Sequence, residues 1–164
     1  MKTAVIFYSL SGNTAYVADI LKEKLDADLF RIRPRDEYPK KGLKKFYFAG
    51  KSAVMAEEPE LIDDPIDLSG YDQLILGTPV WAGTFAPPLR TFLKLNRDVL
   101  REKEVAVYVC CSAGGARKAI EQIRQFLQID HFNEELILID PKEKNTPENK
   151  ERIETFCRNR NKEC

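Results

Sequence analysis

Hydroxyl and amide side chains are concentrated in residues 9–14, directly after an apolar run. The polar residues and the glycine of this segment are Ser9, Ser11, Gly12, Asn13 and Thr14. If a helix begins here, a phosphate could accept hydrogen bonds from these side chains and from the first, partially positive N–H groups of the helix. The segment has no lysine, which the glycine-rich loop of a nucleoside triphosphatase requires. We therefore expect a monophosphate held by neutral donors, or else an ordinary capped helix start.

Two further segments combine glycine with residues suited to contacting a flat ligand. Residues 77–88 include Trp81, the only tryptophan, whose indole could stack on a heteroaromatic ring or serve only in packing. The candidate contacts in this segment are Thr78, Pro79, Val80, Trp81, Ala82 and Gly83. Residues 110–117 include three small residues that would let the backbone approach the polar edge of a ring closely. They are Ala113, Gly114 and Gly115.

Five short runs have the composition of β-strands. They are Ala4–Tyr8, Asp28–Arg33, Leu74–Leu76, Val105–Val109 and Leu136–Ile139. The second alternates polar and apolar residues like an edge strand, and the other four are almost continuously apolar, as in a buried parallel sheet. Apolar residues at helical spacing predict five helices between and after the strands. Their apolar stripes run from Val17 to Leu25, from Leu43 to Val54, from Leu89 to Asn96 and from Ala116 to Leu127, and the last passes through Ile153, Phe156 and Cys157, after a Thr146-Pro147 start signal.

The second of these helices has a distinct pattern of apolar and basic residues. The residues that we expect on its buried face are Leu43, Phe46, Tyr47 and Val54. The lysines that we expect on its solvated face, without a function of their own, are Lys40, Lys41, Lys44, Lys45 and Lys51.

Alternation of strands and helices predicts a three-layer α/β fold. We expect a doubly wound parallel sheet of five strands in the order 2-1-3-4-5, within a single domain that spans residues 1–164. Ligands of such sheets bind at the carboxyl ends of strands 1 and 3, where the winding reverses. The three segments described above follow strands 1, 3 and 4, so this fold would bring them together.

Charge and cysteine content limit the possible functions. Lysine plus arginine (26) equals aspartate plus glutamate (26), so nothing favours nucleic acid or an anionic membrane as a partner. No apolar run is long enough to span a bilayer or resembles a signal peptide, and we expect a cytoplasmic protein without membrane insertion. With four unevenly placed cysteines and one histidine, His131, we expect neither a disulfide framework nor a bound metal.

The first two loops resemble those of the flavodoxin family, and the order of elements is similar over nearly the whole chain. Residues 9–14 (SLSGNT) match the family's phosphate-loop pattern, (T/S)-x-(T/S)-G-x-T. Residues 77–83 (GTPVWAG) resemble its second flavin loop, in which a tryptophan packs on the isoalloxazine ring. The resemblance implies a flavodoxin-like fold and a non-covalently bound FMN. Its phosphate would lie on residues 9–14, its ring against residues 78–83, and the polar edge of the ring on residues 113–115.

The resemblance also implies that the flavin carries the redox chemistry, so that no catalytic acid–base residue is needed. Electron transfer with a redox partner protein is the first expectation, and an NAD(P)H-dependent FMN or quinone reductase is the alternative. Residues 110–118 lack the aromatic residue that family members usually have there, so one flavin face would be open to a quinone or a hydride donor. The chain is also neutral, whereas the family's electron carriers tend to be acidic. Arg117 could stabilise reduced flavin or could simply be solvated.

A different reaction is also compatible with the third loop. Residues 111–117 form the C-x5-R pattern of cysteine-dependent phosphatases. In such an enzyme Cys111 would be the thiolate nucleophile and Arg117 would bind the phosphoryl group. Cys110 and Lys118 differ from the residues usual beside that motif, and no loop clearly presents an aspartate as general acid. A binding module that has kept the fold and lost the cofactor is a third possibility.

Overall fold

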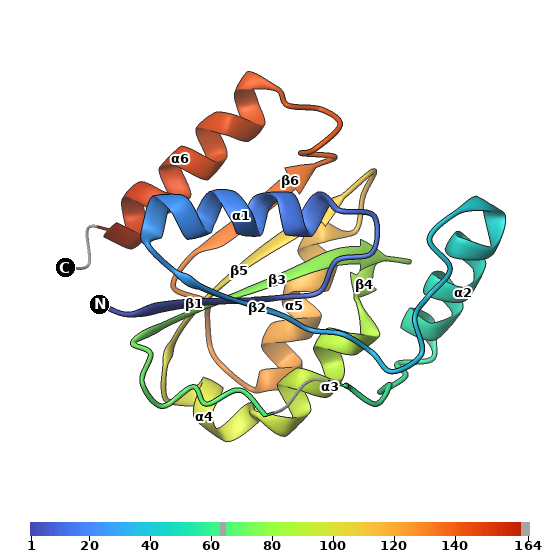
Figure 1. Ribbon diagram of the computed structural model, residues 1–164, viewed down its shortest axis with the longest axis horizontal. Helices are drawn as coiled ribbons and strands as arrows, with labels where there is room; N and C mark the ends of the chain where they lie inside the picture. The colour runs from blue at the N-terminus through green and yellow to red at the C-terminus, as the bar shows by residue number, and fades with distance from the viewer. Residues whose placement is uncertain (63–64, 162–164) are drawn as a thin grey trace.

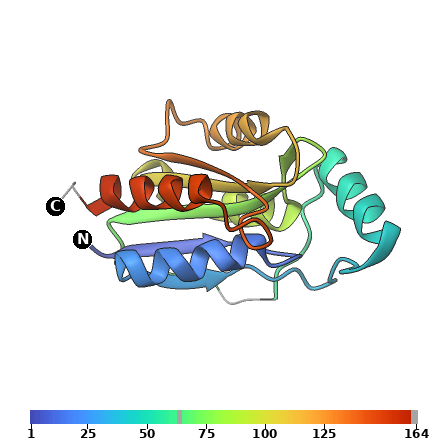
Figure 2. The same ribbon diagram turned by 90° about the horizontal axis from the view of Figure 1, so that it is seen from above.

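The computed structural model describes residues 1–62 and 65–161, with helices on both faces of a central sheet (Figures 1 and 2). Five parallel strands lie in the order β2-β1-β3-β5-β6. Their bounds are β1 Thr3–Phe7, β2 Asp28–Arg31, β3 Gln73–Trp81, β5 Glu104–Cys111 and β6 Glu135–Ile139. The predicted fold class is confirmed, and these five strands have the predicted order. The sheet differs from the prediction by a sixth strand, β4 (Thr84–Phe85), which pairs with β3.

The described residues form six helices. They are α1 Asn13–Leu25, α2 Gly42–Val54, α3 Pro87–Leu95, α4 Arg97–Arg101, α5 Ala116–Leu127 and α6 Pro147–Asn161. The short helix α4 was not predicted. Helix α6 begins at the predicted signal, because the Thr146 hydroxyl accepts a hydrogen bond from the Asn149 N–H at 3.1 Å. None of the helices in this part of the chain is long and apolar enough to cross a membrane.

The core has two clusters, one on each face of the sheet. Val5 of β1 lies in the cluster that contains Leu21 of α1 and Phe156 of α6. Its neighbour Ile6 points to the other face, into the cluster that contains Leu89 of α3. Helices α1 and α6 thus cover one face, and α3, α4 and α5 cover the other (Figure 2). This arrangement leaves the carboxyl edge of the sheet for the loops that follow the strands.

Strand β3 is longer than predicted and ends in a hairpin. Its parallel pairing with β5 continues to Pro79, which lies opposite Cys110. Beyond that point the chain turns back, and Trp81 pairs with Thr84. The two residues of the turn, Ala82 and Gly83, have φ values of 49° and 75°. Positive φ at both central positions is typical of a tight hairpin turn. The apolar pattern did not show this hairpin, because Thr78 and Pro79 interrupt the apolar run of β3 and are typical of a loop.

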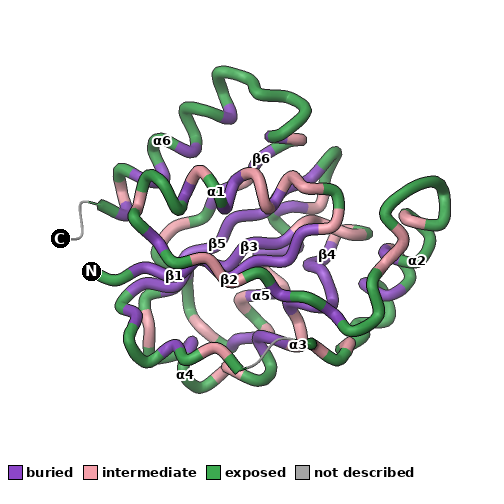
Figure 3. The backbone as a smooth tube through the Cα atoms, viewed as in Figure 1, coloured by how far each residue is buried: buried purple, intermediate pink, exposed green. Residues whose placement is uncertain are grey.

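The prediction for α2 was right for the helix and wrong for its buried face. Leu43, Tyr47 and Val54 are 88%, 63% and 70% exposed, and Phe46 is 72% exposed. The buried residues of α2 are the small ones, Ala49, Ser52 and Ala53. The physical reason is the position of α2, which projects beyond the carboxyl end of the sheet and contacts the ends of β3 and β4 (Figures 1 and 3). Because α2 covers no face of the sheet, its apolar stripe has no core to pack against.

Candidate functional site

The three predicted loops meet at the carboxyl edge of the sheet, because β1, β3 and β5 are adjacent (Figure 1). The second and third loops touch through their backbones. A Cβ atom placed on Gly115 would lie 2.7 Å from the Cα atom of Gly83, and Gly115 has a φ of 90°. A side chain at position 115 would therefore be both strained and in collision.

The first loop presents the start of α1. Gly12, with a φ of 103°, directly precedes the helix. The Ser9 hydroxyl accepts a hydrogen bond from the Ala15 N–H at 3.2 Å, so it satisfies one N–H group of the first turn. The N–H groups of Asn13 and Thr14 also belong to this turn, where a helix offers no acceptor of its own. These groups, with their partial positive charge, make this end of α1 suited to an anion.

A buried tyrosine supports the first loop from below. Tyr108 of β5 is completely buried, and its hydroxyl donates a hydrogen bond to the Thr14 carbonyl oxygen at 3.0 Å. The ring passes beside Gly77 of β3, where a Cβ atom would lie 2.2 Å from the Tyr108 Cζ atom. Glycine at position 77 therefore makes room for the side chain that links β5 to the start of α1.

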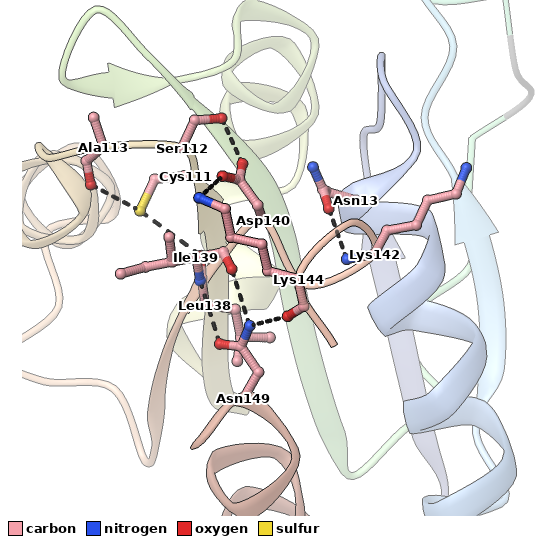
Figure 4. A network of polar contacts seen from close by, with 10 residues as sticks. All are labelled: Asn13, Cys111, Ser112, Ala113, Leu138, Ile139, Asp140, Lys142, Lys144 and Asn149. Atoms are coloured by element: carbon pink, nitrogen blue, oxygen red, sulfur yellow. Dashed lines mark hydrogen bonds and ion pairs between the residues drawn. The ribbon is translucent and has the colours of Figure 1, made fainter. Parts of the chain in front are cut away.

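Two basic side chains lie beside the first loop, although its sequence contains none. The Lys142 N–H donates a hydrogen bond to the Asn13 Oδ1 atom at 2.9 Å, and the Lys142 side chain extends past the start of α1 (Figure 4). Its Nζ atom would lie 3.1 Å from a Cβ atom placed on Gly12. Arg31 of β2 donates a hydrogen bond to the Ser9 carbonyl oxygen at 3.1 Å. The sequence did not predict either residue at this site. Lys142 is 129 residues from Asn13 and Arg31 is 22 residues from Ser9, and no local pattern links residues so far apart.

The second loop holds Trp81 between two tyrosines. The Trp81 ring is half-buried and makes edge contacts with Tyr8 and Tyr38, at centroid distances of 5.5 Å and 5.0 Å. Thr78, a predicted ligand contact, is fully buried. Its hydroxyl accepts a hydrogen bond from the Ala86 N–H and donates one to the Pro79 carbonyl oxygen. The Thr78 hydroxyl therefore shapes the hairpin, and Trp81 is the residue of this loop that offers a ring surface.

Tyr38 also connects Trp81 to α2. Its hydroxyl lies 2.8 Å from the Ser52 Oγ atom, and Ser52 donates its proton to Glu57 at 2.6 Å. Tyr38 is therefore the donor in the first of these hydrogen bonds. Its aromatic contact with Trp81 brings Tyr38, for which the sequence predicted no role, to the site beside Trp81 and Tyr8.

The third loop is fixed by the turn that follows β6. The Ser112 hydroxyl donates a hydrogen bond to Asp140 at 2.6 Å, and Lys144 forms an ion pair with the same carboxylate at 3.0 Å (Figure 4). The hydrogen bond from Ser112 lowers the pKa of Asp140 most, and the contact with Lys144 lowers it further, so this pKa lies below its usual value. Ala113 and Gly114 remain exposed at the tip of the loop. Their backbone is thus accessible to a ligand at this edge.

The phosphatase alternative can be judged from the state of Cys111. Cys111 and Arg117 line one shallow hollow of about 510 Å³, as a C-x5-R motif would require. However, the Cys111 thiol is buried and donates hydrogen bonds to the carbonyl oxygens of Ala113 and Leu138. Burial, and then the charge of Asp140, raise its pKa above the ordinary value. A thiol that is protonated at neutral pH is a poor nucleophile, so the geometry disfavours this reaction.

We expect Cys111 to react slowly with iodoacetamide at pH 7.5 and faster only as the pH rises above the ordinary thiol range. The raised pKa means that the thiolate appears at higher pH in the folded than in the unfolded protein. Peptide mapping by mass spectrometry would give the rate for each cysteine, with protein in urea as the reference. Asp140→Asn should lower the pKa of Cys111 and speed its reaction. Alkylation of folded Cys111 at pH 7.5 as fast as in urea would contradict this assignment.

A cavity lies beside the first loop, on the side of β2. It has a volume of about 730 Å³, and its lining includes Ser9, Leu10, Arg31 and Tyr38. None of its lining residues belongs to the second or third loop. The cavity thus lies on the β2 side of the first loop. The close contact between Gly83 and Gly115 lies outside it.

Comparison with known proteins agrees with this arrangement. A family model described as Flavodoxin matches residues 2–154. A flavoprotein in complex with FMN from Lactobacillus acidophilus is 25% identical, with a TM-score of 0.69 over 87% of this chain and 95% of that chain. Oxidised flavodoxin 2 from Bacillus cereus is 18% identical, with a TM-score of 0.58 over 100% of both chains. Rubredoxin oxygen:oxidoreductase from Desulfovibrio gigas is 13% identical, with a TM-score of 0.62 over 96% of this chain and 34% of that chain. No curated protein matches this chain.

Proposed function

Because this chain belongs to the flavodoxin family, we propose that it binds FMN without a covalent bond and transfers electrons between the flavin and a redox partner protein. The observation that carries the proposal is the convergence of the α1 N-terminus, Trp81 and the glycine-rich third loop at one edge of the sheet. Bound FMN accepts and releases one or two electrons, and the protein supplies binding, orientation and electrostatics.

The first loop fits the phosphate of FMN. We assign as its donors the hydroxyls of Ser9, Ser11 and Thr14, the Asn13 amide, and the first N–H groups of α1. Ser9 and Thr14 are buried, at 4% and 1% exposure, so their hydroxyls would meet the phosphate from within the loop. Lys142 adds a full positive charge beside Gly12, which a phosphate dianion can use. The Asn13 Oδ1 atom accepts a hydrogen bond from the Lys142 backbone, so Asn13 also holds this lysine at the loop. We assign Lys142 to phosphate binding, in addition to the residues predicted from the sequence.

The second and third loops fit the isoalloxazine ring. Trp81 offers a ring surface whose orientation is fixed by Tyr8 and Tyr38. Gly114 and Gly115 bring backbone close to the polar edge of the ring. No residue needs to act as an acid or base in this assignment.

An NAD(P)H-dependent quinone or FMN reductase is the second candidate function. The observation in its favour is the third loop, where Ala113 and Gly114 are exposed and carry no ring that could cover the flavin. Oxidation of NADPH by the flavin-loaded protein with a soluble quinone would support this candidate. Reduction only by a protein donor would support the electron carrier.

Absorption spectra and flavin titrations test the proposal. We expect the protein to retain FMN after desalting and to bind riboflavin at least tenfold more weakly, because riboflavin lacks the phosphate and its charge-assisted hydrogen bonds. Lys142→Gln should weaken FMN about two- to tenfold and leave riboflavin unchanged. The matched control is Lys150→Gln, which replaces an exposed lysine of α6 and should change the affinity for neither FMN nor riboflavin. A protein that takes up no FMN would refute the function, whereas equal FMN affinity of the Lys142→Gln variant would refute only the role of Lys142.

A further inference from the structure

We propose that α2 docks the protein onto an anionic lipid surface, with its axis in the plane of the membrane. The observation is the outer face of α2, defined as the large apolar residues that the structure leaves exposed on this helix and its end. They are Leu43, Phe46, Tyr47, Phe48, Val54 and Met55. Isolated exposed apolar side chains are normal, but six of them on one projecting helix and its end indicate a binding surface.

The lysines of α2 adjoin this outer face. Leu43, Tyr47 and Val54 share one side of the helix. Lys44 directly follows Leu43, and Lys51 lies one turn after Tyr47, so both lysines adjoin this side. No aspartate or glutamate lies between Tyr38 and Ala56, although Lys40 pairs with Glu37 at 2.9 Å. The overall neutrality of the chain thus hides a strongly basic segment. An aromatic and aliphatic face flanked by lysines is the pattern of interfacial helices, whose lysines reach the lipid headgroups.

The opposite side of α2 is already occupied by the protein. Ala49, Ser52 and Ala53 are buried, and Ser52 is held by its hydrogen bonds with Tyr38 and Glu57. The helix cannot turn its apolar residues inward without breaking these contacts. The outer face therefore needs an occupant from outside the chain.

The size and charge of the outer face favour lipid over other occupants. A 13-residue helix is only about 20 Å long, and one side of it cannot supply the roughly 800 Å² per partner that a stable protein interface buries. A second copy of the chain would place lysines opposite lysines, which repel. A lipid surface needs no contact beyond the helix face, since apolar burial and attraction to anionic headgroups add.

Vesicle flotation with the flavin-loaded protein tests the proposal. We expect binding to phosphatidylcholine vesicles that contain 30% phosphatidylglycerol, little binding to pure phosphatidylcholine, and release at high salt. Lys44→Gln and Lys51→Gln should each weaken binding about fivefold. The double variant Leu43→Ser, Tyr47→Ser should weaken it at least tenfold. The matched controls are Lys22→Gln and Leu95→Ser, both exposed on other helices, and should bind like the parent protein.

Two outcomes would overturn the proposal: equal binding to both vesicle types, and binding to neither. In the second case, a dimer in light scattering that Tyr47→Ser dissociates would assign the outer face to a second copy of the chain. Retention of the flavin spectrum in all variants shows that the fold and the cofactor site are intact. Failure of docking is thereby distinguished from failure of FMN binding, on which this inference does not depend.

Discussion

Replacing Gly77 by alanine is expected to lower the free energy of unfolding by about 3 kcal/mol or more. The added Cβ atom would lie 2.2 Å from Cζ and 2.3 Å from Oη of Tyr108, whose ring is completely buried. Overpacking a core costs about 1–3 kcal/mol. Moving the tyrosine also breaks its hydrogen bond to the Thr14 carbonyl and leaves buried polar groups unpaired, at about 1–3 kcal/mol.

Urea unfolding followed by circular dichroism would measure the effect. Gly50→Ala is the control, because a Cβ atom there meets nothing within 4 Å and the residue lies inside α2. Alanine is the better helix former, so this variant should be as stable as the parent or up to about 1 kcal/mol more stable. An unchanged urea midpoint for Gly77→Ala would mean that Tyr108 does not occupy the space beside β3.

Replacing Trp81 by alanine is expected to weaken FMN binding by about 1–3 kcal/mol, which is roughly five- to 150-fold. The physical reason is the loss of a large ring surface for stacking on the isoalloxazine. Riboflavin carries the same ring, so it should lose affinity by the same factor. This pattern differs from that of Lys142→Gln, which should affect only the ligand with a phosphate.

Fluorescence titration of both flavins would separate the two contributions. Trp81→Phe keeps an aromatic ring and should lose little affinity, so it serves as the matched control. Because Trp81 also contacts Tyr8 and Tyr38, the unfolding midpoint of each variant must be measured alongside. Unchanged FMN affinity in a folded Trp81→Ala variant would remove this residue from the ring site.

The elements with strong local patterns could be predicted from the sequence. Helix α5 spans Ala116–Leu127, from the first to the last residue of its predicted apolar stripe, because this stripe faces the core. Strands β1 and β5 were placed within one or two residues for a similar reason, since their continuous apolar runs are buried. The position of the first loop could be predicted from composition, because hydroxyl residues and a glycine between an apolar run and a helical pattern are typical of a strand-to-helix turn.

The remaining features depend on distances that the sequence does not show. The apolar residues of α2 have the period of a buried face, yet the connection from β2 carries the helix past the end of the sheet. Periodicity indicates that a helix has an apolar side, and only the tertiary structure decides what lies there. Lys142 was missed for the same reason. Its place beside Gly12 results from pairing of β6 with β5, far from the loop along the chain.

The hydrogen bond between Asn13 and Lys142 also has a consequence for biosynthesis. Asn13 and Lys142, which are 129 residues apart in the sequence, close the first loop together, and β6 must be paired before Lys142 can reach it. A ribosome releases the N-terminal loop and Trp81 long before this turn emerges from the exit tunnel. A nascent chain thus presents its first loop in an incomplete form until β6 and the turn that carries Lys142 have emerged. If the chain binds FMN as proposed, its full affinity requires that β6 has paired with β5, and flavin uptake then reports that pairing.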